Sequence, residues 1–156
     1  MAKYGFLSIL EEELDKAFHY DYAINWNKKN HAIEVSFILE AQNSSGVETI
    51  DDDGQIVSED ITLEDFILFY QPDKSRFEET DYLVTIPYHP KKGFSREFLA
   101  VFANHLNEVA TDGLSDLMDF LADDSQEEFV MDWKKECFEK ELAQITETTF
   151  FPYPRY

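Results

Sequence analysis

The clearest spacing of potential metal ligands occurs in the segment TIDDDGQIVSED, where carboxylates alternate around a glycine. A calcium-binding EF-hand loop takes its ligands from loop positions one, three, five, seven and twelve, with glycine at position six. When Gly54 is placed at position six, the ligand positions fall on Thr49, Asp51, Asp53, Gln55 and Asp60. The match is partial, because a threonine replaces the first carboxylate and an aspartate replaces the longer glutamate that normally closes the loop.

The residues that flank this loop favour a different structure. An EF-hand needs a helix on each side of the loop, whereas 47–50 and 55–57 are rich in β-forming residues. Asp-Gly between two β-forming segments is a strong signal for a hairpin turn. We therefore predict a β-hairpin here, and calcium binding by Asp51, Asp53 and Asp60 is the alternative.

Other patterns of metal ligands or nucleophiles are weak. The histidines lack the spacing of a metal site, and we expect each to be a surface or hydrogen-bonded structural residue: His19, His31, His89 and His105. Cys137 lies between Trp133 and Leu142 on an apolar helical stripe, which predicts a buried thiol. The glycines are too few and too scattered for a phosphate-binding loop. The sequence thus predicts no catalytic residue, no metal site and no cofactor.

The most regular charge pattern is a row of aspartates in the C-terminal half of the chain. Its members are spaced by four, three and four residues: Asp112, Asp116, Asp119 and Asp123. At this spacing they fall on one face of a helix, and no basic residue occurs between Arg96 and Lys134. We call this row the acidic ridge. Three interpretations stay open: a docking strip for a basic partner, a weak divalent-ion site, or the solvated face of an acidic protein.

The overall charge narrows the class of partner. The chain has 156 residues, of which 33 are acidic and 13 are basic, so the formal net charge is -20. Lys and Arg supply the affinity for nucleic-acid backbones and for anionic membrane surfaces, so this charge argues against both partners. The same charge favours a basic protein partner.

Cysteine content and hydropathy indicate a cytoplasmic protein. A single cysteine cannot form an internal disulfide, so the chain does not call for an oxidising compartment. Carboxylates interrupt the N-terminal segment MAKYGFLSILEEELDKAF from Glu11 onward, which argues against a signal peptide or a membrane span there. No other segment approaches about 18 consecutive apolar residues.

The apolar periodicity predicts a helix followed by strands. Apolar residues recur at helical spacing in the first segment: Phe6, Leu7, Leu10, Leu14, Ala17 and Phe18. The period changes to two in 22–26 and again in 33–39, which predicts a hairpin with one buried face. The run FILFY at 66–70 is apolar on both faces and predicts a central strand. The run from Tyr82 ends near Pro87 and predicts an edge strand.

The second half of the chain has helical periodicity. Ser95 is the predicted N-cap of a first helix, and Gly113, as part of an Asp-Gly pair, is predicted to end it. A short second helix follows over 114–121. The S-x-x-E capping box at 125–128 opens a third helix, which is predicted to run to about Ala143.

These elements indicate a single α+β domain over residues 1–156. It has an antiparallel sheet of about four to five strands, an N-terminal helix and a C-terminal group of about three helices packed on the sheet. The last helix is apolar on two sides, so it lies either between the sheet and a neighbouring helix or in a subunit interface. A homodimer is therefore one of the expected possibilities. The aromatic C-terminal segment TTFFPYPRY is predicted to fold back on its own domain.

Three segments, MAKYGFLSILEEELDKAF, NWNKKNHAIEVSFILEAQN and FFPYPRY, carry a likeness that extends over the whole chain. In them the chain resembles a family of short acidic proteins from Gram-positive bacteria that is known only as a domain of unknown function. The resemblance implies a bacterial cytoplasmic protein and brings no assigned activity or site residues. The order of helix, sheet and closing helix also looks like that of secretion chaperones, which is a likeness of fold alone.

The function expected from the sequence is that of a non-catalytic protein-interaction module. It would bind a basic or partly unfolded protein partner, in the manner of a chaperone or an inhibitor, with the acidic ridge as a contact surface. The alternative is a small hydrolase or transferase that uses carboxylates whose position the sequence does not reveal. A pocket that holds a carboxylate pair with a raised pKa favours the enzyme, and an apolar patch rimmed by acids favours the binder.

Overall fold

The computed structural model describes residues 5–41, 49–50, 56–57, 61–122 and 131–154 of the chain. Its elements are, in chain order, α1 (Phe6–Ala17), β1 (Asp21–Asn27), β2 (Ala32–Ala41), β3 (Thr49–Ile50), β4 (Ile56–Val57), β5 (Ile61–Tyr70), the short 3-10 helix η1 (Glu79–Asp81), β6 (Val84–Pro87), β7 (Phe94–Ser95), α2 (Arg96–Ala122), α3 (Lys135–Ala143) and β8 (Phe150–Phe151). The main sheet has the strand order β1-β2-β5-β6, while β3 pairs with β4 and β7 pairs with β8.

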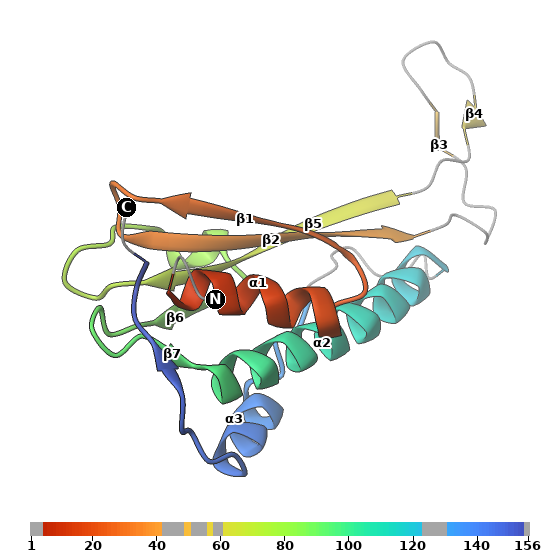
Figure 1. Cartoon of the computed structure of the whole chain (residues 1–156). Coiled ribbons are helices and arrows are strands. Elements are labelled where there is room, and N and C mark those ends of the chain that lie inside the picture. Colours follow the sequence, from red (N-terminus) through yellow and green to blue (C-terminus); the bar gives the residue numbers. More distant parts are fainter. Residues whose placement is uncertain (1–4, 42–48, 51–55, 58–60, 123–130, 155–156) are drawn as a thin grey trace.

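The main sheet and the helices form layers (Figure 1). α1 and α2 pack against each other on one side of the sheet, and α3 lies against the N-terminal half of α2. Helices on one side of a largely antiparallel sheet are the predicted α+β arrangement. Within the described residues, no helix combines the length and the apolarity that a membrane crossing needs.

The sheet differs from the prediction at its last strand. The pairs β1–β2 and β2–β5 are antiparallel, but β6 runs parallel to β5. A parallel pair needs a connection long enough to carry the chain back along the sheet, and the segment 71–83, which includes η1, provides that length. The sheet is therefore mixed, and its parallel strand forms one edge.

Alternation along the strands builds the core, as predicted from the sequence. The backbone register aligns Ile24, Val35 and Ile67 across three strands on one face of the sheet. Residues of this face are buried together with residues of both long helices: Phe6, Leu10, Leu14, Val35, Phe37, Ile67, Phe69, Phe102 and Leu106. Each helix buries against the sheet because one of its faces is apolar and the opposite face is charged.

α2 begins at the predicted cap and continues past the predicted break. Ser95 Oγ accepts a hydrogen bond from the backbone N–H of Phe98 at 2.9 Å, which confirms Ser95 as the N-cap. The helix then runs through Gly113 to Ala122. Gly113 is buried beside Met131, where an added Cβ atom would lie 2.9 Å from the methionine Cε. A glycine inside a helix costs only about 1 kcal/mol relative to alanine, so tertiary packing sustains the helix across it.

Among the described residues the C-terminal helices number two, where about three were predicted. The predicted second helix is the end of α2, and the predicted third is the shorter α3. Lys134 has a left-handed backbone with φ of 58°, so the chain turns sharply before α3 begins at Lys135. The capping box predicted at 125–128 lies outside the described residues. Cys137 is exposed, contrary to the prediction, because α3 turns Phe138 toward the core and consecutive helix residues point about 100° apart.

The C-terminal segment folds back on the domain, as predicted. β8 pairs with β7, and beyond it the carbonyl oxygen of Pro152 accepts a hydrogen bond from the backbone N–H of Phe6 at 2.9 Å. The ring of Tyr153 stacks on the ring of Tyr88, with 4.8 Å between the centroids and 3° between the planes. Gly93, which has a positive φ, lies directly against the backbone of this segment. The segment thus packs on both backbone and side chains of the domain.

Candidate functional site

An apolar groove lies between the edge strand β6 and α3. Its volume is about 450 Å³. The most deeply buried of its lining side chains are aromatic, Trp133 at 7% and Phe138 at 6% exposure. Three further lining side chains are half-buried: Val84 from β6, Phe98 from α2 and Leu142 from α3. Three elements that are far apart in the sequence therefore build one apolar surface.

Ring contacts hold this groove in shape. The rings of Phe98 and Phe138 meet edge to face with centroids 5.9 Å apart, and the rings of Phe138 and Trp133 meet at 5.3 Å. Such aromatic pairs contribute about 0.5–1.5 kcal/mol beyond their burial. Two charged residues of α3 also line the groove, and Lys135 Nζ lies 4.0 Å from Glu139 Oε1. The groove is apolar inside and carries charge at its border.

β6 gives the groove an open strand edge. Among the described strands it has a neighbour on one side only, because the sheet order ends at β6. Pro87 is its last residue, as expected for an edge strand. The outer N–H and C=O groups of an edge strand can pair with an added strand.

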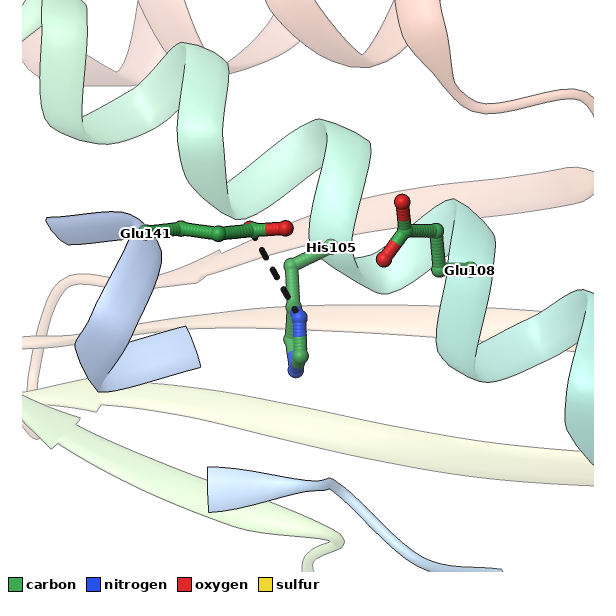
Figure 2. A group of neighbouring side chains, drawn as sticks. All are labelled: His105, Glu108 and Glu141. Carbon is green, nitrogen blue, oxygen red and sulfur yellow. Dashed lines mark ion pairs between the residues drawn. The ribbon is translucent and has the colours of Figure 1, made fainter. Parts of the chain in front are cut away.

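A second group of side chains lies where α2 meets α3 (Figure 2). His105 and Glu108 are one turn apart on α2, and Glu141 reaches toward them from α3. One ligand atom from each residue lies within 4.8 Å of the other two. His105 is fully buried, Glu141 is half-buried and Glu108 is exposed. The group therefore extends from the core to the solvent.

One hydrogen bond of the His105 ring defines its tautomer. Its Nε2 atom lies 2.6 Å from the carbonyl oxygen of Trp133, and because a carbonyl only accepts, Nε2 carries a proton. In the neutral ring Nδ1 is then an acceptor, and it has no hydrogen-bond partner within the described part of the chain. Glu141 Oε2 lies 3.9 Å from Nδ1, which is too far for a hydrogen bond. Buried nitrogens without a partner are uncommon in folded proteins.

Sequence reasoning misses this group. His105 is the hydrogen-bonded structural residue that was expected, but its carboxylate neighbours were not. The spacing His-x-x-Glu was the available signal, because it places His105 and Glu108 on one face of a helix. Glu141 belongs to another helix, so no spacing along the chain could connect it with the other two.

The acidic ridge lies along the C-terminal half of α2. Asp112, Asp116 and Asp119 are exposed on this continuous helix, and Asp123 lies outside the described residues. Asp112 forms an ion pair with Lys134, and the hydrogen bond between them raises the pKa of Lys134 above its usual value. One member of the ridge is therefore already paired with a cation of the same chain.

A hollow between α1 and β1 holds two carboxylates. Its volume is about 460 Å³, and its lining includes Glu11, Asp15 and Tyr22. The Tyr22 hydroxyl donates a hydrogen bond to the Asp15 carboxylate. Burial, followed by the interactions with Asp15, raises the pKa of Tyr22 well above its usual value. The phenol therefore keeps its proton at neutral pH and stays a donor.

The two strands of the hairpin predicted for the calcium-like segment are confirmed. β3 and β4 pair antiparallel, with Thr49 opposite Val57. The described residues on each side of 51–55 are therefore strands, where an EF-hand requires helices. The carboxylates of the alternative interpretation, Asp51, Asp53 and Asp60, lie outside the described residues.

Comparisons with known proteins agree with the resemblance drawn from the sequence. The family model "Protein of unknown function (DUF3013)" matches residues 1–155. A crystal structure of a conserved protein of unknown function from Enterococcus faecalis is similar, with a TM-score of 0.83 and 40% sequence identity over 99% of this chain and 98% of that chain. No curated protein matches the sequence. The chain therefore belongs to the DUF3013 family of proteins of unknown function.

Proposed function

We propose that this protein is a non-catalytic binding module that holds an extended, basic segment of a partly unfolded protein in the groove between β6 and α3. One observation supports the proposal most strongly: an apolar groove runs along a strand that ends the sheet. A peptide that adds to a sheet edge gains main-chain hydrogen bonds, and pockets beside the edge receive its alternate side chains. The groove offers both features together.

The lining of the groove suits apolar side chains of the bound segment. Val84, Phe98 and Leu142 are half-buried, so each still exposes apolar surface that a ligand can cover. Burial of apolar surface contributes about 25 cal/mol per Å². A folded protein hides its alternating apolar residues, whereas a partly unfolded chain exposes them in extended form. The groove therefore favours an unfolded segment over a folded surface.

The charge of the protein favours a basic segment. A net charge of -20 attracts cationic chains, and Asp112, Asp116 and Asp119 of the acidic ridge concentrate part of that charge on α2. Because Asp112 already pairs with Lys134, the attraction of a basic segment depends mainly on the other aspartates of the ridge. Charges at the border of an interface act mainly on the rate of association.

Two matched peptides test this function. Each is about eight residues long, which is sufficient to pair with a strand, and valine alternates with lysine in one and with glutamate in the other. The lysine peptide should bind and protect the β6 amides from hydrogen exchange, and the glutamate peptide should not. Raising the salt concentration from about 0.1 M to about 1 M shortens the Debye length from about 10 Å to about 3 Å and should slow association. Equal binding of both peptides, or of neither, contradicts the proposal.

A second copy of the chain is the competing occupant of the β6 edge. A homodimer paired along β6 would block the groove, so peptide binding would weaken as the protein concentration rises. Sedimentation equilibrium measured beside the peptide titration distinguishes the two occupants. If the protein forms a dimer that dissociates when the lysine peptide binds, a second copy of the chain occupies the groove in the free protein.

A small hydrolase or transferase is the second candidate function, and the hollow between α1 and β1 favours it. Glu11 and Asp15 are one turn apart on α1 and both line the hollow, as an acid–base pair would. A panel of ester and phosphoester substrates tests this candidate. Turnover that is lost in Glu11→Gln and Asp15→Asn but kept in Glu139→Gln supports it. Absence of turnover across the panel counts against the enzyme, and the binding role is then the only candidate function that remains.

A further inference from the structure

We propose that His105, Glu108 and Glu141 bind a divalent transition-metal ion of the zinc class. The observation that carries this inference is Nδ1 of His105, a buried nitrogen without a hydrogen-bond partner in the described part of the chain, which faces a carboxylate of the neighbouring helix (Figure 2). The site goes beyond the binding role of the groove, because it stands whether or not the groove holds a peptide.

The surroundings of the imidazole are those of a metal ligand. A histidine that binds a metal through one ring nitrogen typically donates its other N–H to a carbonyl or carboxylate, which fixes the ring orientation. Nε2 of His105 already makes such a bond to the carbonyl of Trp133 at 2.6 Å. Nδ1 is left as a desolvated acceptor, and a buried acceptor without a partner is unfavourable. A cation bound at Nδ1 removes this deficit.

Two helices supply the carboxylates. Glu108 follows His105 by three residues and shares its side of α2, while Glu141 projects from α3. The ligand atoms lie within 4.8 Å of one another, whereas ligands about 2.0–2.2 Å from one ion are separated by about 3–4 Å. Side-chain rotation can close this difference, because Glu108 is exposed and the Glu141 side chain is 39% exposed.

The donor set selects the class of ion. One imidazole nitrogen and two carboxylate oxygens suit Zn²⁺, Co²⁺ or Mn²⁺, whereas Ca²⁺ and Mg²⁺ prefer sites made of oxygen ligands. Three protein ligands leave at least one coordination position open on the exposed side of Glu108. The ion would also tie α3 to α2, and Leu142, the neighbour of Glu141, lines the groove. Metal binding would therefore stiffen one wall of the groove.

Titration of the intact protein with Co²⁺ tests the site. Bound Co²⁺ should give a visible absorption band, Zn²⁺ should displace it, and Zn²⁺ should raise the melting temperature. Glu108→Gln and Glu141→Gln preserve side-chain size, and each should weaken Co²⁺ binding roughly 10- to 100-fold. Glu136→Gln is the matched control, because it removes the same charge from an exposed position on α3. It should leave the Co²⁺ affinity essentially unchanged.

The acidic surface of the chain requires a control for unspecific binding. A chain with a net charge of -20 attracts any divalent cation, so the titrations are repeated with Ca²⁺ and at about 0.5 M salt, where surface charges are screened. The proposal is wrong if Ca²⁺ displaces Co²⁺ with the same efficiency as Zn²⁺. It is also wrong if Glu136→Gln weakens Co²⁺ binding as much as Glu141→Gln does. The lack of a Zn²⁺-induced shift in the His105 ring signals by NMR likewise overturns it.

Discussion

The hydroxyl group of Tyr153 accepts a hydrogen bond of 2.7 Å from Nε1 of Trp26, and this bond joins the C-terminal segment to the first strand of the sheet. The ring of the same tyrosine stacks on Tyr88, which follows β6. Its backbone N–H donates to the carbonyl oxygen of Pro90 at 3.2 Å. One residue near the C-terminus therefore connects β1 with the end of β6, the two edges of the main sheet.

Gly93→Ala should destabilise the protein by about 3 kcal/mol or more. Gly93 has φ of 63°, a left-handed conformation that costs a residue with a Cβ atom about 1–2 kcal/mol. The added Cβ would also overlap the carbonyl oxygen of Phe151 in the C-terminal segment, and overpacking typically adds about 1–3 kcal/mol. Urea unfolding followed by circular dichroism measures the change.

Gly113→Ala is the matched control for this prediction. Gly113 is buried, but its added Cβ would meet the flexible side chain of Met131 rather than a backbone carbonyl. Alanine gains about 1 kcal/mol of helix propensity over glycine, which offsets much of the crowding. Equal destabilisation by the two substitutions would show that the C-terminal segment does not pack tightly on Gly93.

Arg96→Met should destabilise the contact between α1 and α2. The Nη1 and Nη2 atoms of Arg96 each lie 3.1 Å from a carboxylate oxygen, of Glu13 and Glu12 respectively. Glu13 is only 8% exposed, so loss of the guanidinium leaves a desolvated carboxylate with a weaker partner. We expect a loss of about 1–3 kcal/mol, the range for a buried polar group without its partner. Urea unfolding measures the loss.

Lys16→Met removes a charge near the same carboxylate and serves as the control. Lys16 Nζ lies 3.7 Å from Glu13 Oε1, but the lysine side chain is 67% exposed. Exposed ion pairs contribute less than about 1 kcal/mol. If Lys16→Met costs as much as Arg96→Met, the two-carboxylate contact of Arg96 does not hold the helices together.

Asp65→Asn should raise the stability at neutral pH. Asp65 lies opposite Phe37 in the register of the sheet, on the core-facing side of β5, and burial raises the pKa of Asp65 above its usual value. The folded protein therefore holds this proton more tightly than the unfolded chain does. The contribution of Asp65 to stability falls as pH rises from its unfolded pKa through its folded pKa. Urea unfolding at several pH values measures the free energy of unfolding, and the decrease with pH that Asp65 causes should be absent from the variant.

Glu97→Gln provides the comparison of opposite sign. The Glu97 carboxylate accepts hydrogen bonds from the backbone N–H groups of Thr148 at 2.6 Å and Thr149 at 3.2 Å, and these bonds lower the pKa of Glu97. Its stabilising contribution is present above the unfolded pKa and is lost as pH falls through the folded pKa. The variant should therefore be less stable at neutral pH. Two variants that change stability in the same direction would contradict this assignment.

Cys137 should react with a thiol reagent in the folded protein. Its side chain is exposed on α3, so reagent can reach the sulfur without unfolding. The rate in native buffer should be close to the rate in denaturant, measured by release of a chromophore on labelling. Protection that is lost only on unfolding would place the thiol in the core and move the start of α3.

Local sequence patterns were sufficient for the elements that depend on neighbouring residues. The alternation over 22–26 predicts a strand because successive side chains of a strand point to opposite faces, and β1 spans that segment. Ser95 predicts the start of α2 because a cap acts on the first turn of its own helix. The edge position of β6 follows in the same way from Pro87.

Features that depend on distant residues could not be predicted. Gly113 stays helical because Met131 packs on it, and this contact crosses from one helix to the segment before the next. The side of α3 that faces the core depends on the turn at Lys134, which sets where the helix begins. His105 and Glu141 meet only because α3 folds back on α2. Contacts of this kind arise from tertiary packing and leave no periodic signal in the sequence.

The most direct test of the binding role compares two lysine substitutions at adjacent residues of α3. Leu142 is half-buried and lines the groove, whereas Ala143 is exposed and is not among the lining residues. Both substitutions add the same charge, so a difference between them reports on the position of that charge and on the apolar contact that Leu142 makes. The measurement is the affinity of each variant, shown by circular dichroism to be folded, for the alternating valine–lysine peptide.

Leu142→Lys should weaken the affinity for this peptide at least about tenfold, or about 1.4 kcal/mol, because it removes apolar contact and places a like charge in the groove. Ala143→Lys should weaken it far less, through the change in net charge alone. An equal loss of affinity in the two variants, or full affinity in Leu142→Lys, would contradict binding in the groove between β6 and α3.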